Sequence, residues 1–413
     1  ERMKKWMSGL LALILTLTVC AGCGEKPSHE DGSGAPTPTG LYYGITGIDP
    51  AATVMTVDGN EISAELYFYW VAYNCSSLEY EITMYNAYAG LYGELIGEDG
   101  KLLWDAGFTD NMTLGQYAVL QAERTIQFYA VVENAAKRHG ITLTQEDETA
   151  LDEYFAATAE QAGGEEVFLE NLELMGITQD TFRYVTASSY LYNHLVELVQ
   201  QEGSELYLPL EDYRQYGAYA DHILLMTRNA ETGEALGEEE AAAKRQTAED
   251  LLAQLQAAED VEALFAQLAD EYSEDTGRAS YPDGYLFGKG EMVQSFEDAA
   301  FALEPGQLSG IVESDYGFHI ILGKDLLSKL EESPEQKEKL AGDYLSQLLE
   351  KEMDASQVTY SDLLDGFDPG AFYSKYTETV EARQAEKKAQ ENDGAGDADA
   401  APEDEDAAPE DGQ

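Results

Sequence analysis

Two histidines stand in matching sequence contexts and are the residues whose chemistry is easiest to interpret. His222 lies in the run Ala220-Asp-His-Ile-Leu-Leu225, and His319 lies in Asp315-Tyr-Gly-Phe-His-Ile-Ile-Leu322. Both runs are short and apolar, which predicts two buried strands. The chain has only five histidines, so a coincidental placement of two of them in matched strands is a poor explanation.

Apolar and acidic residues lie between the two histidines. The run Phe287-Gly-Lys-Gly-Glu-Met292 is followed by Ser295-Phe-Glu-Asp-Ala-Ala-Phe-Ala-Leu303. Met292 and Phe296 are four residues apart, so one turn of helix would place them on one face. Asp275 belongs to a Ser-Glu-Asp turn before them.

The periodicity of residues 219–324 predicts the elements that must position these side chains. Their order is strand, helix, helix, strand, helix, strand, strand. The predicted helices are 238–257, 261–272 and 296–303, and the predicted strands are those of the two histidines, 285–287 and 311–312. With the motifs above, this order resembles the parvulin family of peptidyl-prolyl isomerases, which has a small antiparallel sheet with flanking helices.

The resemblance implies rotation of X-Pro bonds in other polypeptides. The barrier to that rotation is ~18–20 kcal/mol, because amide resonance must be lost. Lowering it requires neither a metal nor a cofactor, and none is expected here. By resemblance, His222, Asp275 and His319 form the catalytic polar set. The two histidines would lie on adjacent central strands, and hydrogen bonds between their imidazoles would fix tautomer and orientation.

The resemblance also assigns residues that bind the substrate. Met292 and Phe296 would grip the proline ring, and Phe287 would support the floor of the slot. A position near the rotating bond that is Ser or Thr in some relatives corresponds here to Ser314 or Tyr316, and Tyr316 completes the expected substrate-binding set.

The sequence departs from the parvulin pattern in two places. The usual Gly-Gly-Asp-Leu-Gly is replaced by Tyr281-Pro-Asp-Gly-Tyr-Leu286, so the slot-lining Leu is lost or its role passes to Tyr285 or Leu286. After His222, Arg228 stands alone. Recognition of phosphorylated Ser-Pro or Thr-Pro is therefore not expected, since binding a dianion needs paired cations.

The half of the chain before this module is predicted to be mainly helical. Residues 54–57 read as a strand entering a tight turn, and Ser63, Thr113 and Thr144 have the spacing of helix N-caps. This region resembles the N-terminal part of PrsA/SurA-type foldases. The expected fold is thus α+β, with a mainly helical chaperone-like region and a small parvulin domain. Most of the 27 tyrosines are expected at core or half-core positions; an aromatic cradle for unfolded segments is the alternative.

The N-terminus reads as a bacterial lipoprotein signal. Lys4 and Lys5 precede an apolar run at residues 10–19, and small residues lead directly to Cys23. Lipid on Cys23 would anchor the protein to the membrane, outside the cytoplasm. Cys20 would leave with the signal, so Cys75 would be the single thiol of the mature chain and no internal disulfide is expected.

Composition sets the remaining boundaries. The predicted domains are a signal peptide at 1–22, a flexible tether at 23–47, a helical chaperone-like domain at 48–210, a parvulin domain at 216–326, a C-terminal helical segment at 327–380 and an acidic disordered tail at 381–413. Residues 336–376 are expected to pack back onto the N-terminal half.

The net charge of −56 argues against nucleic-acid binding, because phosphate contacts need Lys and Arg. His139 and His194 lack ligand-spaced partners, so no metal site is expected. The leading hypothesis is a membrane-tethered foldase that acts on unfolded or partly folded secreted polypeptides containing proline. The alternatives are a holdase chaperone with an inactive parvulin scaffold, and a solute-binding lipoprotein, against which the helical periodicity argues.

Overall fold

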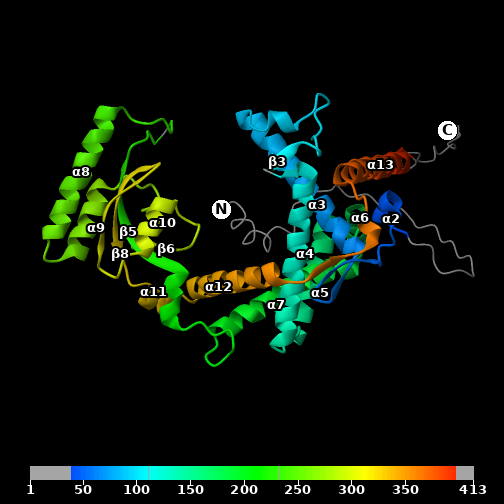
Figure 1. Ribbon diagram of the computed structural model, residues 1–413, viewed down its shortest axis with the longest axis horizontal. Helices are drawn as coiled ribbons and strands as arrows, with labels where there is room; N and C mark the ends of the chain where they lie inside the picture. Colours follow the sequence, from blue (N-terminus) through cyan, green and yellow to red (C-terminus); the bar gives the residue numbers. More distant parts are fainter. Residues whose placement is uncertain (1–38, 110, 231, 397–413) are drawn as a thin grey trace, which may run out of the picture. The chain divides into compact units, whose positions relative to one another are not determined.

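The computed structural model describes residues 39–396 except 110 and 231 (Figure 1). The described residues form two compact units: a helical unit of residues 39–191 and 351–396, and an isomerase unit of residues 192–350. The predicted signal peptide, Cys23 and most of the tether lie outside the described residues, as does the acidic tail from residue 397 onward. No helix within the described residues is long and apolar enough to span a bilayer.

The helical unit contains a small sheet that begins with the predicted strand. β1 (Thr53–Val57) pairs antiparallel with β2 (Asn60–Ser63) on one side and with β9 (Val358–Tyr360) on the other. The turn between β1 and β2 has Asp58 at φ 47° and Gly59 at φ 86°. Positive φ at both central residues is the requirement of the tight hairpin turns that match strand twist, so this predicted turn is confirmed.

Helices make up most of this unit. They are α2 (Leu41–Thr46), α3 (Ala64–Ala89), α4 (Leu114–Arg138), α5 (Gln145–Ala162), α6 (Glu165–Met175), the start of α7 (Gln179–Gln200) and α13 (Pro369–Gly396), with the short elements η1 (Gly93–Leu95), β3 (Gly107–Thr109), β4 (Met112–Thr113) and η3 (Asp362–Leu364) between them. The predicted caps are present: the Ser63 side chain accepts from the Leu66 amide, and Thr113 and Thr144 each form a capping box.

Aromatic rings contribute to the core of the helical unit, and most tyrosines of the chain are buried or half-buried, as predicted. Tyr42 and Phe68 are buried, and their rings lie against Phe372 of α13 at centroid distances of 6.1 and 5.3 Å. The C-terminal segment thus packs back through β9 and α13, as the sequence predicts for the later part of residues 336–376. α12 (Pro334–Ala355) instead lies mostly in the isomerase unit.

The predicted disordered tail begins too early. α13 continues to Gly396, so residues 381–396 are helical in backbone rather than irregular. The run 381–390 consists of Glu, Ala, Arg, Gln and Lys, which are the strongest helix formers. The negative charge of the segment that follows hid this local preference.

The isomerase unit has the predicted order of elements around a four-stranded antiparallel sheet. The strands are β5 (Gly217–Met226), β6 (Tyr285–Gly288), β7 (Leu308–Ser314) and β8 (Gly317–Gly323), in the order β6-β5-β8-β7. α8 (Glu238–Ala257) and α9 (Val261–Tyr272) cover one face, and α10 (Gln294–Phe301) covers the other (Figure 1). The end of α7, η2 (Leu210–Gln215), α11 (Leu326–Glu332) and α12 complete the unit.

Alternation along the two central strands separates two cores. Ile223, Leu225 and Ile320 point to the cluster beneath α8 and α9. Ala220 and Ile321 point to a second cluster beneath α10. Because successive strand residues face opposite sides, His222 and His319 must face the side of α10.

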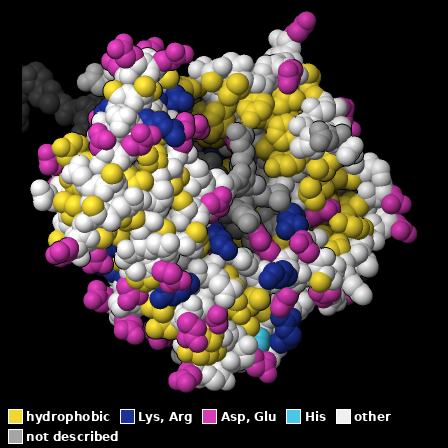
Figure 2. All heavy atoms as spheres, turned by 60° about the vertical axis from the view of Figure 1, so that its left-hand side comes forward, with side chains coloured by type: hydrophobic (Ala, Val, Ile, Leu, Met, Phe, Trp, Pro, Cys, Tyr) yellow, Lys and Arg dark blue, Asp and Glu magenta, His cyan; other side chains and the backbone are white. Residues whose placement is uncertain are grey.

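The surface is acidic. Figure 2 shows one face of the molecule, on which Asp and Glu side chains are scattered among fewer Lys and Arg. This agrees with 80 acidic against 24 basic residues in the chain.

Candidate active site

The two central strands bring the predicted histidines together. β5 and β8 are paired so that His222 lies opposite Ile321 and His319 lies opposite Leu224. The histidines are therefore diagonal neighbours on one face of the sheet. Their ring centroids are 5.4 Å apart with an interplanar angle of 58°, and both residues are buried.

Phe296 of α10 closes the space over both imidazoles. Its ring centroid lies 5.1 Å from that of His222 and 5.3 Å from that of His319. Phe287 of β6 is 5.9 Å from Phe296, and Met292 packs against the same cluster while remaining partly exposed. Met292 precedes α10, so the expectation that it shares a helical face with Phe296 is wrong. The turn before the helix still brings it into the apolar cluster.

Asp275 is fixed at the edge of the imidazole pair. Its Oδ2 atom lies 3.6 Å from His222 Nε2, and its side chain is 18 % exposed. The preceding residues are bonded to β5: the Glu274 amide donates to the Leu224 carbonyl at 2.8 Å, and the Leu224 amide donates to Ser273 Oγ at 3.1 Å. The loop after α9 therefore follows the strand and delivers the carboxylate to His222.

The expected hydrogen bond between the two imidazoles is absent from the described residues, so that prediction is wrong. His319 Nε2 instead lies 2.7 Å from Ser314 Oγ, and His222 Nε2 faces Asp275. The Nδ1 atoms of both rings are buried without a hydrogen-bond partner in the described part of the chain. The diagonal register and the tilt of the rings account for the difference.

Of the two residues considered near the rotating bond, Ser314 is the one that contacts an imidazole. Tyr316 lies in the turn between β7 and β8 and is 52 % exposed. Its amide donates to Ser314 Oγ at 3.1 Å, so it touches the polar set through the serine.

Burial keeps both imidazoles neutral. Desolvation lowers the pKa of His319 to about 4, and the neighbouring His222 lowers it further than burial alone would. Desolvation also lowers the pKa of His222, although the carboxylates of Asp275 and Asp221 oppose the shift. At neutral pH the site therefore holds uncharged rings beside one carboxylate.

Tyr285 also belongs to this site, although it was not among the predicted site residues. Its hydroxyl donates to Asp275 Oδ2 at 2.5 Å, and its ring is stacked on His222 at a centroid distance of 5.5 Å. The sequence left the missing slot residue open between Tyr285 and Leu286. Strand parity resolves it, because Tyr285 is two residues before Phe287 and must share its face.

An ion pair closes the loop that carries Asp275. Arg278 Nη1 donates at 2.7 Å to Asp221, which is 5 % exposed, and Arg278 also binds Asp270. The guanidinium is thus committed to two carboxylates of the unit itself, which leaves it unsuited to hold a phosphate on a substrate.

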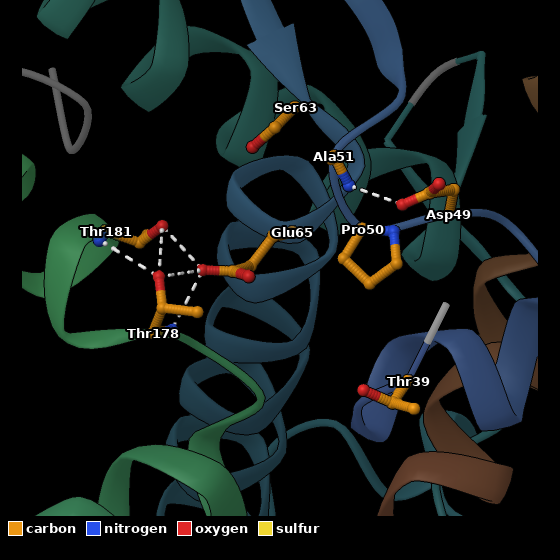
Figure 3. A pocket seen from close by; sticks show the side chains of 8 residues that line it. All are labelled: Thr39, Asp49, Pro50, Ala51, Ser63, Glu65, Thr178 and Thr181. Carbon is orange, nitrogen blue, oxygen red and sulfur yellow. Dashed lines mark hydrogen bonds between the residues drawn. The ribbon is translucent and has the colours of Figure 1, made fainter. Parts of the chain in front are cut away.

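The helical unit has a surface cavity of about 320 Å³ whose lining residues include neither histidine nor an aromatic side chain (Figure 3). In it Glu65 accepts from the Thr178 amide and hydroxyl at 2.8 Å and from the Thr181 hydroxyl at 2.5 Å. These residues begin α7, so the carboxylate satisfies and stabilises a helix N-terminus. This arrangement is structural.

Comparison with known proteins agrees with the geometry. Residues 222–325 match the model of the PPIC-type PPIase (rotamase) domain family. The chain is 32% identical over 253 residues to the foldase protein PrsA of Halalkalibacterium halodurans, and the alignment covers 60% of this chain and 70% of that protein.

The chain belongs to the PrsA foldase family. A second member, from Staphylococcus aureus, is 29% identical over 222 residues, covering 53% of this chain and 64% of its own. The crystal structure titled peptidylprolyl isomerase (PrsA) from Bacillus cereus is 20% identical, covers 67% of this chain and 98% of that chain, and has a TM-score of 0.31.

Membership of the PrsA family confirms the predicted fold class, a mainly helical region with a small parvulin domain. It also confirms the predicted activity: the protein is a foldase with a parvulin-type peptidyl-prolyl isomerase domain. The inactive-scaffold alternative is not favoured.

Proposed function

We propose that His222, His319 and Asp275 are the catalytic groups of this PrsA-family isomerase, and that Phe296, Met292 and Phe287 hold the proline ring, with Tyr316 at the exposed rim. The observation that carries the proposal is the packing of one Phe ring against two buried, neutral imidazoles beside a carboxylate.

The apolar slot favours the twisted amide. A planar amide is dipolar, because resonance places partial negative charge on oxygen and partial positive charge on nitrogen. The twisted form has lost that resonance and is less dipolar. Moving the bond from water to a dry site lined by Phe296 therefore destabilises the planar forms more than the transition state, which is the requirement for catalysis.

The polar groups act in the same direction. The carboxylate of Asp275 beside the substrate carbonyl disfavours the resonance form with negative charge on oxygen. A charged imidazolium would do the opposite and stabilise the planar amide. The low pKa values of His222 and His319 therefore matter, because neutral rings do not cancel the effect of Asp275. No covalent bond to the enzyme forms in this mechanism, and it needs neither a metal nor a cofactor.

The proposed setting is the outer face of the bacterial cytoplasmic membrane. The lipoprotein-like sequence before Cys23 supports a lipid anchor there, and the PrsA relatives are named foldases. The proposed substrates are unfolded or partly folded secreted polypeptides containing proline. Incorporation of labelled fatty acid into the wild type and its loss in Cys23→Ala tests the anchor; labelling of both proteins contradicts it.

Isomerisation of an Ala-Pro peptide tests the site. We expect His222→Ala and His319→Ala each to lower kcat/KM at least about tenfold, because preorganised groups around the reacting bond are commonly worth that much or more. His139→Ala, outside the isomerase unit, is the matched control. Wild-type protein that suppresses aggregation of unfolded chains but leaves peptide exchange at its uncatalysed rate would instead support the inactive scaffold.

A further inference from the structure

We propose that Tyr285 is a positioning residue of the isomerase site, whose hydroxyl holds the Asp275 carboxylate in one orientation beside His222. The inference rests on the proposed function, since it assumes that Asp275 acts there. The inference also assigns a role to Tyr285, which lies where this sequence departs from the parvulin pattern.

The backbone alone does not orient the carboxylate. Hydrogen bonds from Ser273 and Glu274 to Leu224 fix the loop against β5, but the Asp275 side chain still rotates about its own bonds. Two donors stop that rotation. The Gly277 amide donates to Oδ1 at 3.0 Å, and the Tyr285 hydroxyl donates to Oδ2 at 2.5 Å.

Of the two donors, the Tyr285 hydroxyl is the one that fixes the carboxylate oxygen facing His222. Oδ2 is both the atom bonded to Tyr285 and the atom 3.6 Å from His222 Nε2. Burial and the adjacent carboxylate raise the pKa of Tyr285, so its proton stays on the hydroxyl throughout the physiological range. An O–H donor to an ionised oxygen forms a short, strong hydrogen bond. Without it, only the Gly277 amide would hold the carboxylate, and the position of Oδ2 relative to the imidazole would no longer be fixed.

Two glycines make this contact possible. A Cβ at Gly277 would lie 2.3 Å from the Tyr285 hydroxyl oxygen, so any larger residue there would displace the hydroxyl. Gly284, at φ +100°, would have its Cβ 2.6 Å from the Ala220 carbonyl oxygen. Because glycine has no Cβ, β6 can begin close enough to β5 for Tyr285 to reach the site. The local sequence is thus compatible with the bond on both sides.

The test compares two tyrosines of the same sheet in the full chain. Tyr285→Phe removes the hydroxyl bonded to Asp275, while Tyr219→Phe removes one bonded to the Asp283 carbonyl at 2.9 Å. We expect Tyr285→Phe to lower kcat on an Ala-Pro peptide about tenfold, with KM changed less than about twofold, and Tyr219→Phe to change neither by more than about twofold. Equal losses in the two variants, or kcat of Tyr285→Phe within about twofold of wild type, overturn the proposal.

Two further variants separate positioning from direct contact with the substrate. In an Asp275→Ala background, Tyr285→Phe should cause no additional loss, because the hydroxyl acts only through the carboxylate. A full, independent loss there overturns the proposal. Gly277→Ala keeps the hydroxyl but displaces it, so kcat should fall as in Tyr285→Phe; wild-type kcat in this variant counts against the proposal.

A spectroscopic readout distinguishes failure of this inference from failure of the proposed function. If wild-type protein leaves peptide exchange uncatalysed, the proposed function fails. The ring nitrogen NMR signals of His222 still report on Asp275. They should move in Tyr285→Phe, as the freed carboxylate changes its approach to the ring, and stay in place in Tyr219→Phe. Unchanged His222 signals in Tyr285→Phe overturn the positioning role.

Discussion

Glu123 in the helical unit and Asp221 in the isomerase unit are sheltered carboxylates with different partners. In the helical unit, Glu123 accepts from the hydroxyls of Tyr67 and Tyr360 at 3.0 and 2.9 Å, and Glu79 accepts from a third tyrosine at 2.7 Å. Among the described residues of the isomerase unit, the most deeply buried carboxylate is that of Asp221, which is paired with Arg278.

The difference follows from composition and burial. Twenty-four Lys and Arg cannot pair with 80 acids, whereas 27 tyrosines supply neutral donors. A neutral donor satisfies a half-buried carboxylate such as Glu123, and a backbone amide satisfies the buried Glu297, whereas the buried Asp221 has an opposite charge beside it. Asp275 resembles the first group, since it too is bonded to a tyrosine. A tyrosine–carboxylate pair is therefore no mark of an active site by itself; imidazoles and an apolar slot must accompany it.

The largest expected effect concerns the ion pair. Arg278→Ala would leave Asp221 buried without its countercharge, so we expect a loss of about 3 kcal/mol or more in the free energy of unfolding. Arg183→Ala in the helical unit is the matched control. Arg183 also binds two carboxylates, Glu148 and Asp152, but both are well exposed, so about 1 kcal/mol or less is expected. Urea denaturation of the full chain measures both.

A comparable loss in the two arginine variants would contradict the proposed distinction between the units. The double variant Arg278→Ala/Asp221→Asn tests whether the unpaired charge of Asp221 causes the loss of stability. Removing the stranded charge should restore part of the stability lost in Arg278→Ala, because much of that loss is the cost of an unpaired buried carboxylate.

The next effect compares two carboxylates bonded to tyrosine. Asp275→Ala should lower kcat/KM on a proline peptide about thirtyfold, because it removes the charge beside the rotating bond. Glu123→Gln should leave peptide turnover unchanged, since Glu123 has no imidazole beside it and its role is to hold Tyr67 and Tyr360. An effect of Glu123→Gln on turnover of a short peptide would show that the comparison is wrongly drawn.

The order of elements and the placement of the candidate site residues were predictable because their signals are local. Alternation of apolar residues fixed the faces of the strands, and cap spacing fixed helix starts at Ser63, Thr113 and Thr144. The strand positions of His222 and His319 follow from the same reasoning, whereas their roles and that of Phe296 come from the resemblance to parvulins and stay predictions. The predicted site residues were thus brought together by elements that the sequence itself defines.

What the sequence did not predict depends on register and on side-chain rotation. The diagonal pairing of β5 and β8 separates the imidazoles, and this register is set by turns and packing rather than by the strand residues. The bond from Tyr285 to Asp275 joins a strand to a loop and has no spacing signal. The helix at residues 381–396 was not predicted, because the acidic composition of the C-terminal segment indicates disorder while the helix formers at 381–390 favour a helix.

The third prediction concerns pH, to which the two units should respond in opposite directions. Burial lowers the pKa of His319 to about 4, below the ~6.5 of an unfolded chain. Between these values the unfolded state binds a proton that the native state excludes. The stabilising contribution is therefore complete above pH ~6.5 and is lost as the pH falls toward 4. Urea midpoints at pH 7.5 and 5 should fall more in wild type than in His319→Gln.

Glu123 supplies the opposite sign. Desolvation raises its pKa, so its native state holds a proton more readily than the unfolded state does. The contribution of Glu123 to stability therefore decreases as the pH rises from the pKa of an unfolded Glu through the higher native pKa. Glu123→Gln should flatten this dependence in the helical unit. Identical pH profiles for wild type and both variants would show that neither buried group governs the acid response.

The smallest expected effect concerns which residue may precede the proline. The ring of Tyr281 is 54 % exposed and lies 4.8 Å from the ring of Tyr285, which extends an aromatic surface outward from the imidazoles. A substrate chain that leaves the slot past Asp275 meets this surface with the residue before its proline. Aromatic contacts of this kind contribute about 1 kcal/mol, so the ratio of kcat/KM for Phe-Pro over Glu-Pro peptides should fall about threefold to fivefold in Tyr281→Ala. An unchanged ratio would show that the residue before the proline does not contact Tyr281. A Leu-Pro peptide adds a second comparison. If Tyr281→Ala lowers kcat/KM more for Phe-Pro than for Leu-Pro, ring stacking, and not apolar area alone, distinguishes this exposed aromatic surface from the tyrosines of the helical core.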